Sequence, residues 1–297
     1  MDAAGTTEDR VFGRPELYPP LPPALYPDTE TDIFSVSVEG AEVRYACRGA
    51  PSRPPLVFVH GWGASFKFWK KTLPYFSPRF RCLAPDLPGF GASEKPDRDY
   101  SMEALAVWLG RFLDAVGVRR ASIVGHSMGG TVALLLALEA PERVERLAVV
   151  NPVVTGSTAF SGAYRFLMMP GIRTAAWLLA RGKRFRRWVA RDFSYVQRLD
   201  DELADDVARP TYRAAVETLR ALAKVDLAPR LERLSMPVLS VGTDLDRVVA
   251  PGQFRQVPGR TVLLSGCGHM PMLERPDEFN RRLDAFLRGE DGPDQSF

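Results

Sequence analysis

Six short apolar runs, none longer than four residues, constrain the fold of this chain more than any other feature of its sequence. A strand that is apolar along its whole length is typical of a parallel sheet buried between two layers of helices. We therefore predict six buried strands, at residues 56–59, 82–84, 122–124, 147–150, 238–241 and 261–264.

Three segments of the chain carry apolar residues at the spacing of an amphipathic helix. They are residues 102–116, 128–138 and 276–288, and each of them follows one of the predicted strands. Strands that alternate with helices along a chain predict a single doubly wound α/β sheet, with most of its strands parallel.

The start of the folded part has a different pattern. Residues 33–39 and 41–46 alternate between apolar and polar side chains, and Gly40 lies between them. This pattern is typical of two half-buried antiparallel strands joined by a turn. The predicted fold is therefore a mostly parallel α/β sheet with an antiparallel N-terminal edge.

The chain divides into three regions. Residues 1–31 contain six prolines, which exclude a helix or a central strand there and indicate an extended N-terminal arm. Residues 152–234 have helical patterns and no buried-strand run, so we predict an inserted helical lid. Residues 32–151 and 235–297 then form the core, and the lid emerges where ligands bind in open α/β sheets.

Composition and charge exclude several classes of protein. Apolar residues make up 45% and charged residues 25% of the 297 residues, as in ordinary globular proteins, and the net charge of +3 does not indicate a nucleic-acid binder. Cys47, Cys82 and Cys267 lack CxxC spacing, so neither a disulfide framework nor a metal site is predicted. Without a secretory signal or a membrane-spanning apolar run, we expect a soluble cytoplasmic protein.

The strongest local motif is the run of residues 125–130, Gly-His-Ser-Met-Gly-Gly, which contains G-x-S-x-G. A predicted strand precedes it and a predicted helix follows it. A sharp turn from strand to helix places its central residue in a strained backbone conformation, and glycines on both sides prevent clashes. We therefore predict that Ser127 is exposed at the sheet edge as a nucleophile.

A serine hydroxyl needs a base to take its proton, and the chain has only three histidines. His126 adjoins Ser127 and points in the wrong direction to reach its hydroxyl, while His60 ends a buried strand. His269 lies in a loop after the last predicted strand, at the same sheet edge as Ser127. His269 is therefore the predicted base.

The histidine in turn needs a carboxylate that holds its tautomer. Asp244 and Asp246 both follow the strand at 238–241, and their spacing alone does not choose between them. The order serine, aspartate, histidine along the chain fits either residue.

Acyl transfer also needs amide donors for the developing oxyanion. Residues 60–63, His-Gly-Trp-Gly, leave a buried strand as a glycine-rich loop. We predict the backbone N–H groups of Trp62 and Met128 as the oxyanion hole.

Together these motifs resemble the α/β-hydrolase superfamily, and specifically its lid-bearing serine esterase and lipase-like branch. The resemblance rests on residues 60–63, 86–93, 125–130, 246–249 and 268–280. It implies that Ser127 attacks and that His269 is the base. It favours Asp246 as the acid, although Ala250 separates the Asp-Arg-Val-Val stretch from Pro251, so Asp244 remains the alternative.

The resemblance also separates this chain from neighbouring branches. The segment that begins at Asp86 is similar to a structural loop of the family, which implies a scaffold role for Asp86. Haloalkane dehalogenases and epoxide hydrolases resemble the chain elsewhere, but they have an aspartate where this chain has Ser127.

We therefore predict a serine hydrolase that cleaves carboxylic esters through a Ser-His-Asp triad and an acyl-enzyme, with no cofactor and no metal. The expected substrate is a small-molecule ester with an apolar acyl part. The same residues are compatible with hydrolysis of carbon–carbon bonds in diketone-type substrates, with acyl transfer and with cofactor-free perhydrolysis. A binding module without catalysis is a further alternative.

The predicted lid carries the substrate preference. Apolar residues that we expect to line an acyl pocket are Trp62, Phe166, Met168, Met169 and Trp177. Between residues 155 and 191 the lid has eight cationic residues and no acidic one. One interpretation is a peripheral contact with anionic membranes; the other is a solvated face balanced by acidic residues between 200 and 206.

Overall fold

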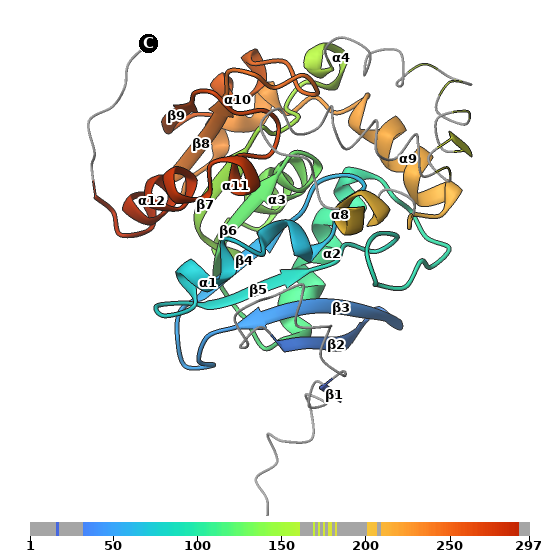
Figure 1. Ribbon diagram of the computed structural model, residues 1–297, viewed down its shortest axis with the longest axis horizontal. Helices are drawn as coiled ribbons and strands as arrows, with labels where there is room; N and C mark the ends of the chain where they lie inside the picture. Colours follow the sequence, from blue (N-terminus) through green and yellow to red (C-terminus); the bar gives the residue numbers. More distant parts are fainter. Residues whose placement is uncertain are drawn as a thin grey trace, which may run out of the picture.

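A single sheet of nine strands forms the centre of the computed structural model, which describes residues 16–17, 32–160, 169, 172, 175, 178, 179, 182, 201–206 and 209–290 (Figure 1). The strand order across the sheet is β1-β2-β3-β5-β4-β6-β7-β8-β9. The strands are β1 (Glu16–Leu17), β2 (Asp32–Val38), β3 (Ala41–Arg48), β4 (Pro55–Val59), β5 (Arg81–Pro85), β6 (Ala121–His126), β7 (Val144–Val150), β8 (Val238–Thr243) and β9 (Arg260–Leu264).

The strand directions confirm the predicted fold class. β1, β2, β3 and β5 pair antiparallel at the N-terminal edge, and every pair from β5 through β4, β6, β7 and β8 to β9 is parallel. All six buried strands and the hairpin around Gly40 form where the sequence predicts them. Parallel strands place their carboxyl ends at one edge, so the loops after β4, β6, β7, β8 and β9 meet there.

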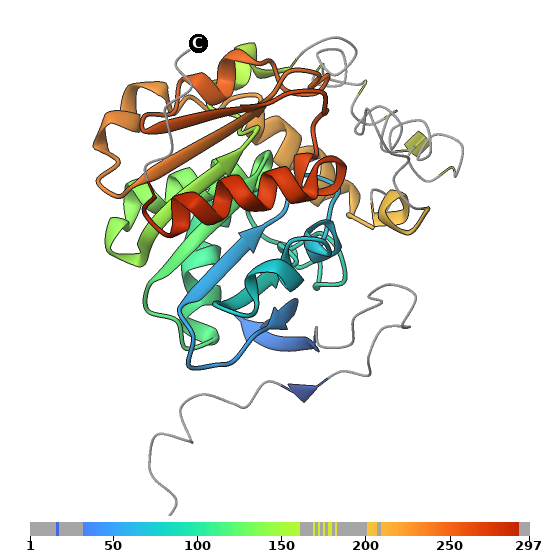
Figure 2. The same cartoon turned by 60° about the vertical axis from the view of Figure 1, so that its left-hand side comes forward.

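Helices cover both faces of this sheet (Figure 2). The longer helices agree closely with the predicted ones: α2 (Met102–Ala115), α3 (Met128–Glu139) and α12 (Pro276–Leu287). Six short helices, which the sequence analysis does not predict, lie in the connections. They are η3 (Phe66–Trp69), α1 (Leu73–Phe76), η4 (Pro141–Arg143), α4 (Gly156–Ala159), α10 (Gly252–Arg255) and α11 (Pro271–Glu274).

Each central strand contributes side chains to two separate apolar clusters, because successive strand residues point to opposite faces of the sheet. In β4, Val57 and Val59 pack in the cluster that contains α2 and α3. Leu56 and Phe58 pack in the other cluster, with η3, α1 and α12. All four side chains are fully buried, which explains why the strand has no polar residue.

The described part of the segment between β7 and β8 contains helices but no strand. After α4 it holds α8 (Asp201–Asp206), α9 (Tyr212–Leu222) and η5 (Ala228–Arg233). An isolated bridge between Thr155 and Asp226 joins the two ends of this segment to each other, and a second bridge, between Phe160 and Val249, joins its N-terminal part to the core. We call residues 152–234 the β7–β8 segment; that they form a separate lid remains a prediction.

The carboxylate of Asp86 ties together two loops that follow β4 and β5. Its Oδ1 accepts a hydrogen bond from the Phe66 N–H and its Oδ2 one from the Ala92 N–H, each at 2.7 Å. The side chain is fully buried, and this burial raises the pKa of Asp86 to about 7. Asp86 thus fixes the backbone next to residues 60–65, a loop that bears on the site described below.

We expect Asp86→Asn to lower the free energy of unfolding by about 1–3 kcal/mol at pH 5, measured by urea denaturation. The amide presents an NH₂ group to one of the two N–H donors and leaves that donor buried without an acceptor. The loss should be smaller at pH 8. The folded pKa of about 7 lies above 3.8, the ordinary pKa of an aspartate, so the contribution of Asp86 to stability decreases as the pH rises through this interval.

The matched control is Asp277→Asn, at an exposed position in the first turn of α12. It should change the free energy of unfolding by less than about 0.5 kcal/mol at either pH. A loss for Asp86→Asn that equals the control, or one that is larger at pH 8 than at pH 5, would contradict this role.

Candidate functional site

Ser127 lies at the turn between β6 and α3, in a backbone conformation that side chains rarely adopt. Its φ is +52° and its ψ is −118°. Gly125 and Gly129 make this turn possible: a Cβ on Gly125 would lie 2.4 Å from the Gly129 carbonyl oxygen, and one on Gly129 would lie 2.4 Å from that of Val59. Such a strained turn, held by its surroundings, is a common feature of functional sites.

His269 and Asp246 are brought together by the loops that follow β9 and β8. The Nδ1–H of His269 donates to Oδ2 of Asp246 at 2.7 Å, and both side chains are only 2% exposed. The other oxygen of Asp246 accepts the N–H groups of Val248 and Val249, at 2.8 and 3.0 Å. These bonds orient the carboxylate, so the imidazole has one preferred tautomer with its proton on Nδ1.

Asp244, the alternative acid, lies elsewhere in the same loop region. Its Oδ1 accepts a hydrogen bond from the N–H of Gly266 at 2.8 Å. Gly266 has a φ of +70°, so Asp244 stabilises a tight turn after β9. Of the two candidate aspartates, the structure therefore places Asp246 against His269 and uses Asp244 to cap a loop.

The backbone of His269 is held from both sides. Its carbonyl accepts hydrogen bonds from Nε2–H of His126 at 2.9 Å and from Nδ2–H of Asn151 at 3.1 Å. The carboxylate of Glu274, which is 5% exposed, accepts the N–H groups of Gly268 and Met270, the residues before and after His269. The histidine is thus fixed from the ends of β6 and β7 and from Glu274, the last residue of α11.

Sequence analysis does not identify Asn151 and Glu274, although both have recognisable signals. Asn151 directly follows β7 at the edge where the other loops meet, and its φ is +44°. Glu274 lies within the motif at 268–280, six residues after Gly268. Its position just before α12, which begins with Pro276, is the signal that it can cap the loop around His269.

His126 contacts His269 directly, with ring centroids 4.6 Å apart. Burial and the neighbouring charge of His269 hold the pKa of His126 well below its ordinary value, so the ring is neutral and keeps its proton on Nε2. His126 thus acts on the backbone of His269, as a donor to its carbonyl. This agrees with the expectation that His126 is directed away from the hydroxyl of Ser127.

The loop at residues 60–65 lies directly against Ser127. A Cβ built on Gly61 would be 3.2 Å from Cβ of Ser127 and 3.0 Å from Nδ1 of His126, so only glycine allows the loop to approach this closely. The Gly61 carbonyl accepts Nδ1–H of His60 at 2.7 Å, and Nε2 of His60 accepts the Leu87 N–H at 2.9 Å. Burial lowers the pKa of His60 to about 4, which keeps it neutral.

These bonds orient the peptide group between Gly61 and Trp62. The carbonyl and the N–H of one peptide group point in opposite directions, so a Gly61 carbonyl that faces His60 turns the Trp62 N–H away from it. Among the described residues, none accepts a hydrogen bond from this N–H. Met128 is the first residue of α3, where backbone N–H groups have no partner within the helix.

Most of the predicted acyl-pocket residues lie outside the described part of the chain. These are Phe166, Met168 and Trp177. The cationic residues between 165 and 191, on which the interpretation as a membrane contact depends, also lie outside the described part. Met169 is described and is 50% exposed. Trp62 is partly buried against the apolar cluster of α2 and α3, and its Nε1–H donates to the carbonyl of Ala215 in α9, at 3.1 Å.

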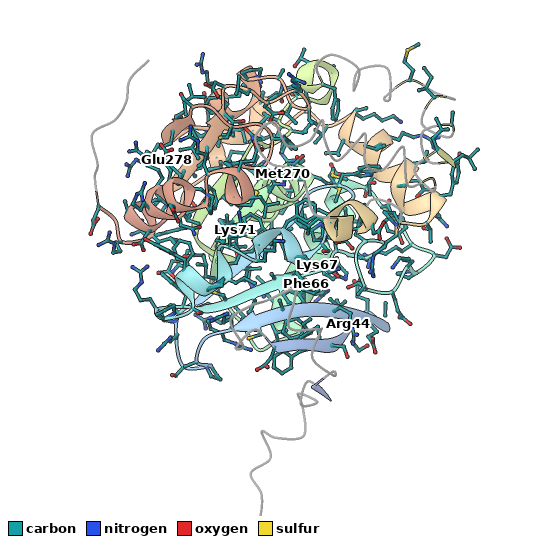
Figure 3. The ribbon with its side chains drawn as sticks, viewed as in Figure 1. Arg44, Phe66, Lys67, Lys71, Met270 and Glu278 are labelled. Atoms are coloured by element: carbon teal, nitrogen blue, oxygen red, sulfur yellow. The ribbon has the colours of Figure 1, made fainter. Side chains whose placement is uncertain are left out.

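One of the acidic residues that the sequence analysis expects to balance the cationic face is buried. Asp206 is 1% exposed and accepts a hydrogen bond from Oγ of Ser65, while Lys67 and Arg209 lie 3.6 and 2.9 Å from its Oδ1. Figure 3 labels Lys67 and Phe66 beside α8. Asp206 is therefore an internal ionic contact between α8 and the chain that follows the 60–65 loop.

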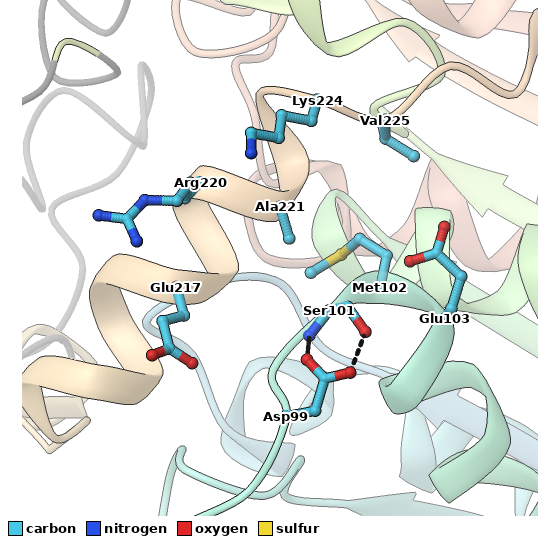
Figure 4. A pocket seen from close by; sticks show the side chains of 9 residues that line it. All are labelled: Asp99, Ser101, Met102, Glu103, Glu217, Arg220, Ala221, Lys224 and Val225. Carbon is cyan, nitrogen blue, oxygen red and sulfur yellow. Dashed lines mark hydrogen bonds between the residues drawn. The ribbon is translucent and has the colours of Figure 1, made fainter.

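A separate groove of about 370 Å³ lies between the N-terminal end of α2 and the side of α9 that faces it (Figure 4). None of its lining residues is Ser127, His269 or Asp246. Met102, Ala221 and Val225 form its apolar part; the others are Asp99, Ser101, Glu103, Glu217, Arg220 and Lys224. Asp99 is occupied by the N–H and hydroxyl of Ser101, both at 2.8 Å.

The described residues contain no group of three or more His, Cys, Asp or Glu side chains arranged to hold a metal ion. Among the same residues, no helix has both the length and the apolar character needed to cross a membrane.

The proteins related to this chain include an esterase, a lactonase and a phospholipase. Pimeloyl-(acyl-carrier protein) methyl ester esterase of Edwardsiella ictaluri is 34% identical over 255 residues, which make up 79% of this chain and 93% of that protein. 3-Oxoadipate enol-lactonase 2 of Acinetobacter baylyi is 26% identical and covers 86% and 96%. The crystal structure of a membrane phospholipase A, described as a bacterial virulence factor, has a TM-score of 0.74 at 28% identity and covers 88% and 87%.

A family model extends this similarity over most of the core and the β7–β8 segment. It is described as the alpha/beta hydrolase family and matches residues 56–282, a range that contains the turn at Ser127 and the loops after β8 and β9. The sheet order, the turn at Ser127 and this match agree with one another. The chain therefore belongs to the alpha/beta hydrolase family.

Proposed function

We propose that this protein hydrolyses carboxylic esters with Ser127 as nucleophile, His269 as general base and Asp246 as the acid that orients it. The observation that carries the proposal is the 2.7 Å hydrogen bond between Nδ1–H of His269 and Asp246, buried at the sheet edge where Ser127 occupies its strained turn. Three of the related proteins named above act, by their names, on ester or lactone bonds.

In the first half of the reaction, Oγ of Ser127 attacks the carbonyl carbon of the ester. Because Asp246 holds the proton on Nδ1, Nε2 is the nitrogen of His269 that takes the serine proton. The carbonyl oxygen becomes an oxyanion, which accepts hydrogen bonds from the backbone N–H groups of Trp62 and Met128. The bond to the alcohol then breaks, and Nε2 returns the proton to the leaving oxygen.

The second half repeats these steps with water. Nε2 of His269 takes a proton from water, the hydroxide attacks the acyl-enzyme, and the same two N–H groups hold the second oxyanion. Collapse breaks the bond to Oγ of Ser127, which regains its proton and leaves a carboxylic acid. Asp246 stays ionised throughout and stabilises the imidazolium that forms in each half.

The proposed substrate is a small ester with an apolar acyl part. Trp62, in the 60–65 loop, is partly buried against the apolar cluster of α2 and α3. Acyl length and the alcohol are matters for a substrate panel, which also separates this reaction from the alternatives that share its residues.

We expect a fluorophosphonate probe to label the wild-type protein and not Ser127→Ala, because the probe reacts only with an activated serine. On p-nitrophenyl esters from acetate to palmitate, Ser127→Ala should lose at least about 10³-fold in kcat. Labelling that persists in Ser127→Ala would contradict the assignment. A diketone-type substrate, and the best ester with an added alcohol or peroxide, are tested in parallel. We expect the diketone to be cleaved more slowly than the best ester, and the acyl-transfer or peroxy acid product to form more slowly than the free acid.

We expect Asp246→Asn to lower kcat by about 10³–10⁴-fold, because an amide no longer holds the proton on Nδ1 of His269. The matched control is Asp244→Asn, two residues earlier in the same loop, which should change kcat less than about threefold. Its amide oxygen can still accept the Gly266 N–H. Steady-state kinetics on one ester decide the matter: a larger loss for Asp244→Asn than for Asp246→Asn would assign the acid to Asp244.

A further inference from the structure

We propose that helices α8 and α9 position the oxyanion hole, by holding the 60–65 loop through Asp206 and the backbone carbonyl of Ala215. This inference rests on the proposed function, because it assigns a task to the loop only if the Trp62 N–H stabilises an oxyanion. It makes the indole N–H of Trp62 and the hydroxyl of Ser65 positioning groups, which act through the backbone and not on the substrate.

The first contact joins the centre of the loop to α9. Nε1–H of Trp62 donates to the carbonyl of Ala215 at 3.1 Å, so the residue whose backbone N–H faces the site is anchored through its own side chain. The Ala215 carbonyl also accepts the hydroxyl of Thr218, at 3.2 Å. The Trp62 bond is therefore an addition to a helix that is already satisfied, and its removal leaves no buried carbonyl without a partner.

The second contact joins the end of the loop to α8. Oγ of Ser65 donates to Oδ2 of Asp206, and both residues are 1% exposed. Lys67, which is 7% exposed, and Arg209 lie near the other carboxylate oxygen. A carboxylate buried this deeply is stable only while its cationic and hydrogen-bonding partners stay in place, so this contact fixes Ser65 strongly.

Helix α9 is itself attached to the core and to the start of the β7–β8 segment. α9 packs so closely on the loop after β5 that a Cβ on Gly89 would lie 2.5 Å from Cβ of Ala214. Beyond the C-terminal end of α9, the Val225 carbonyl accepts the N–H of Gly156, at 2.7 Å. In Figure 1, α8 and α9 lie on the side of the molecule where the loops from the sheet edge emerge.

The loop thus has two sets of supports. From the core, His60 holds the Gly61 carbonyl and Asp86 holds the Phe66 N–H, which fixes both ends of the loop. From the β7–β8 segment, Trp62 and Ser65 are held by α9 and α8. The core packs against the side chain of Trp62, but the hydrogen bond of its indole N–H goes to α9, so the orientation of its peptide group depends on the helices as well.

The test uses Trp62→Phe and Ser65→Ala, each of which removes one side-chain donor from the loop. Ser65→Ala also removes the acceptor of the Lys67 N–H, while Lys67 and Arg209 remain beside the carboxylate of Asp206. With a p-nitrophenyl ester, we expect each variant to lower kcat about tenfold and to change KM less than twofold, because an oxyanion forms only after substrate binding. The inhibition constant of a trifluoromethyl ketone, which forms an oxyanion on Ser127, should rise about tenfold. That of the carboxylate product should not change.

The control is Thr218→Val, which removes another hydrogen bond to the same Ala215 carbonyl; the hydroxyl of Thr218 donates to carbonyls of α9 and not to the loop. It should keep kcat within about twofold, and thermal unfolding of all three variants shows whether each is folded. If Trp62→Phe and Ser65→Ala both match this control, or if they raise KM at constant kcat, the positioning role is wrong.

Ser127→Ala distinguishes this failure from that of the proposed function. If Ser127→Ala loses turnover while Trp62→Phe and Ser65→Ala behave as wild type, the hydrolase assignment stands and the positioning role fails. If Ser127→Ala keeps turnover, the proposed function fails, and the inference that depends on it fails with it.

Discussion

The close approach of three backbone segments around Ser127 is the constraint on which the rest of the site depends. The turn brings α3 so near to the end of β4 that Gly129 meets the carbonyls of Val59 and His60, and Gly61 meets the side chain of Ser127. A Cβ on Gly129 would overlap these carbonyls, and one on Gly61 would force its neighbours to move. The turn at Ser127, the glycine-rich loop and the N-terminus of α3 are therefore placed relative to one another mainly by main-chain packing.

Polar side chains then fix the loops that main-chain packing leaves free. Asp246 orients the imidazole of His269, while Glu274, His126 and Asn151 hold its backbone. His60 has a comparable task in the loop after β4. Each of these groups is buried and makes at least one hydrogen bond to the backbone, so the site has little freedom to rearrange without breaking several bonds at once.

The sequence predicts the strands and long helices of the core well, because their apolar periodicity is a local property. It also identifies Ser127 and His269 as candidates, since a glycine-flanked turn and a scarcity of histidines are visible without a fold. The choice between Asp244 and Asp246 is different. Both follow β8 within a few residues, and only the three-dimensional path of the loop after β9 separates the partner of His269 from the cap of Gly266.

Contacts between distant segments are what the sequence could not predict. Asp206 lies in an acidic stretch that is typical of a solvated face, yet it is buried against Ser65, which is 141 positions away along the chain. Nothing near either residue indicates the pairing. Glu274 is an intermediate case, because it lies inside a recognisable motif but its partners are backbone N–H groups, which leave no trace in composition.

The bridges at Thr155 and Phe160, together with the attachments of α8 and α9, divide the β7–β8 segment by its dependence on the core. Residues up to 160 and from 201 onward are joined to the hydrolase body through specific bonds. A substitution in α8 or α9 can therefore alter the 60–65 loop, which packs against Ser127, although these helices lie 141 and 153 positions away from their contacts in the loop.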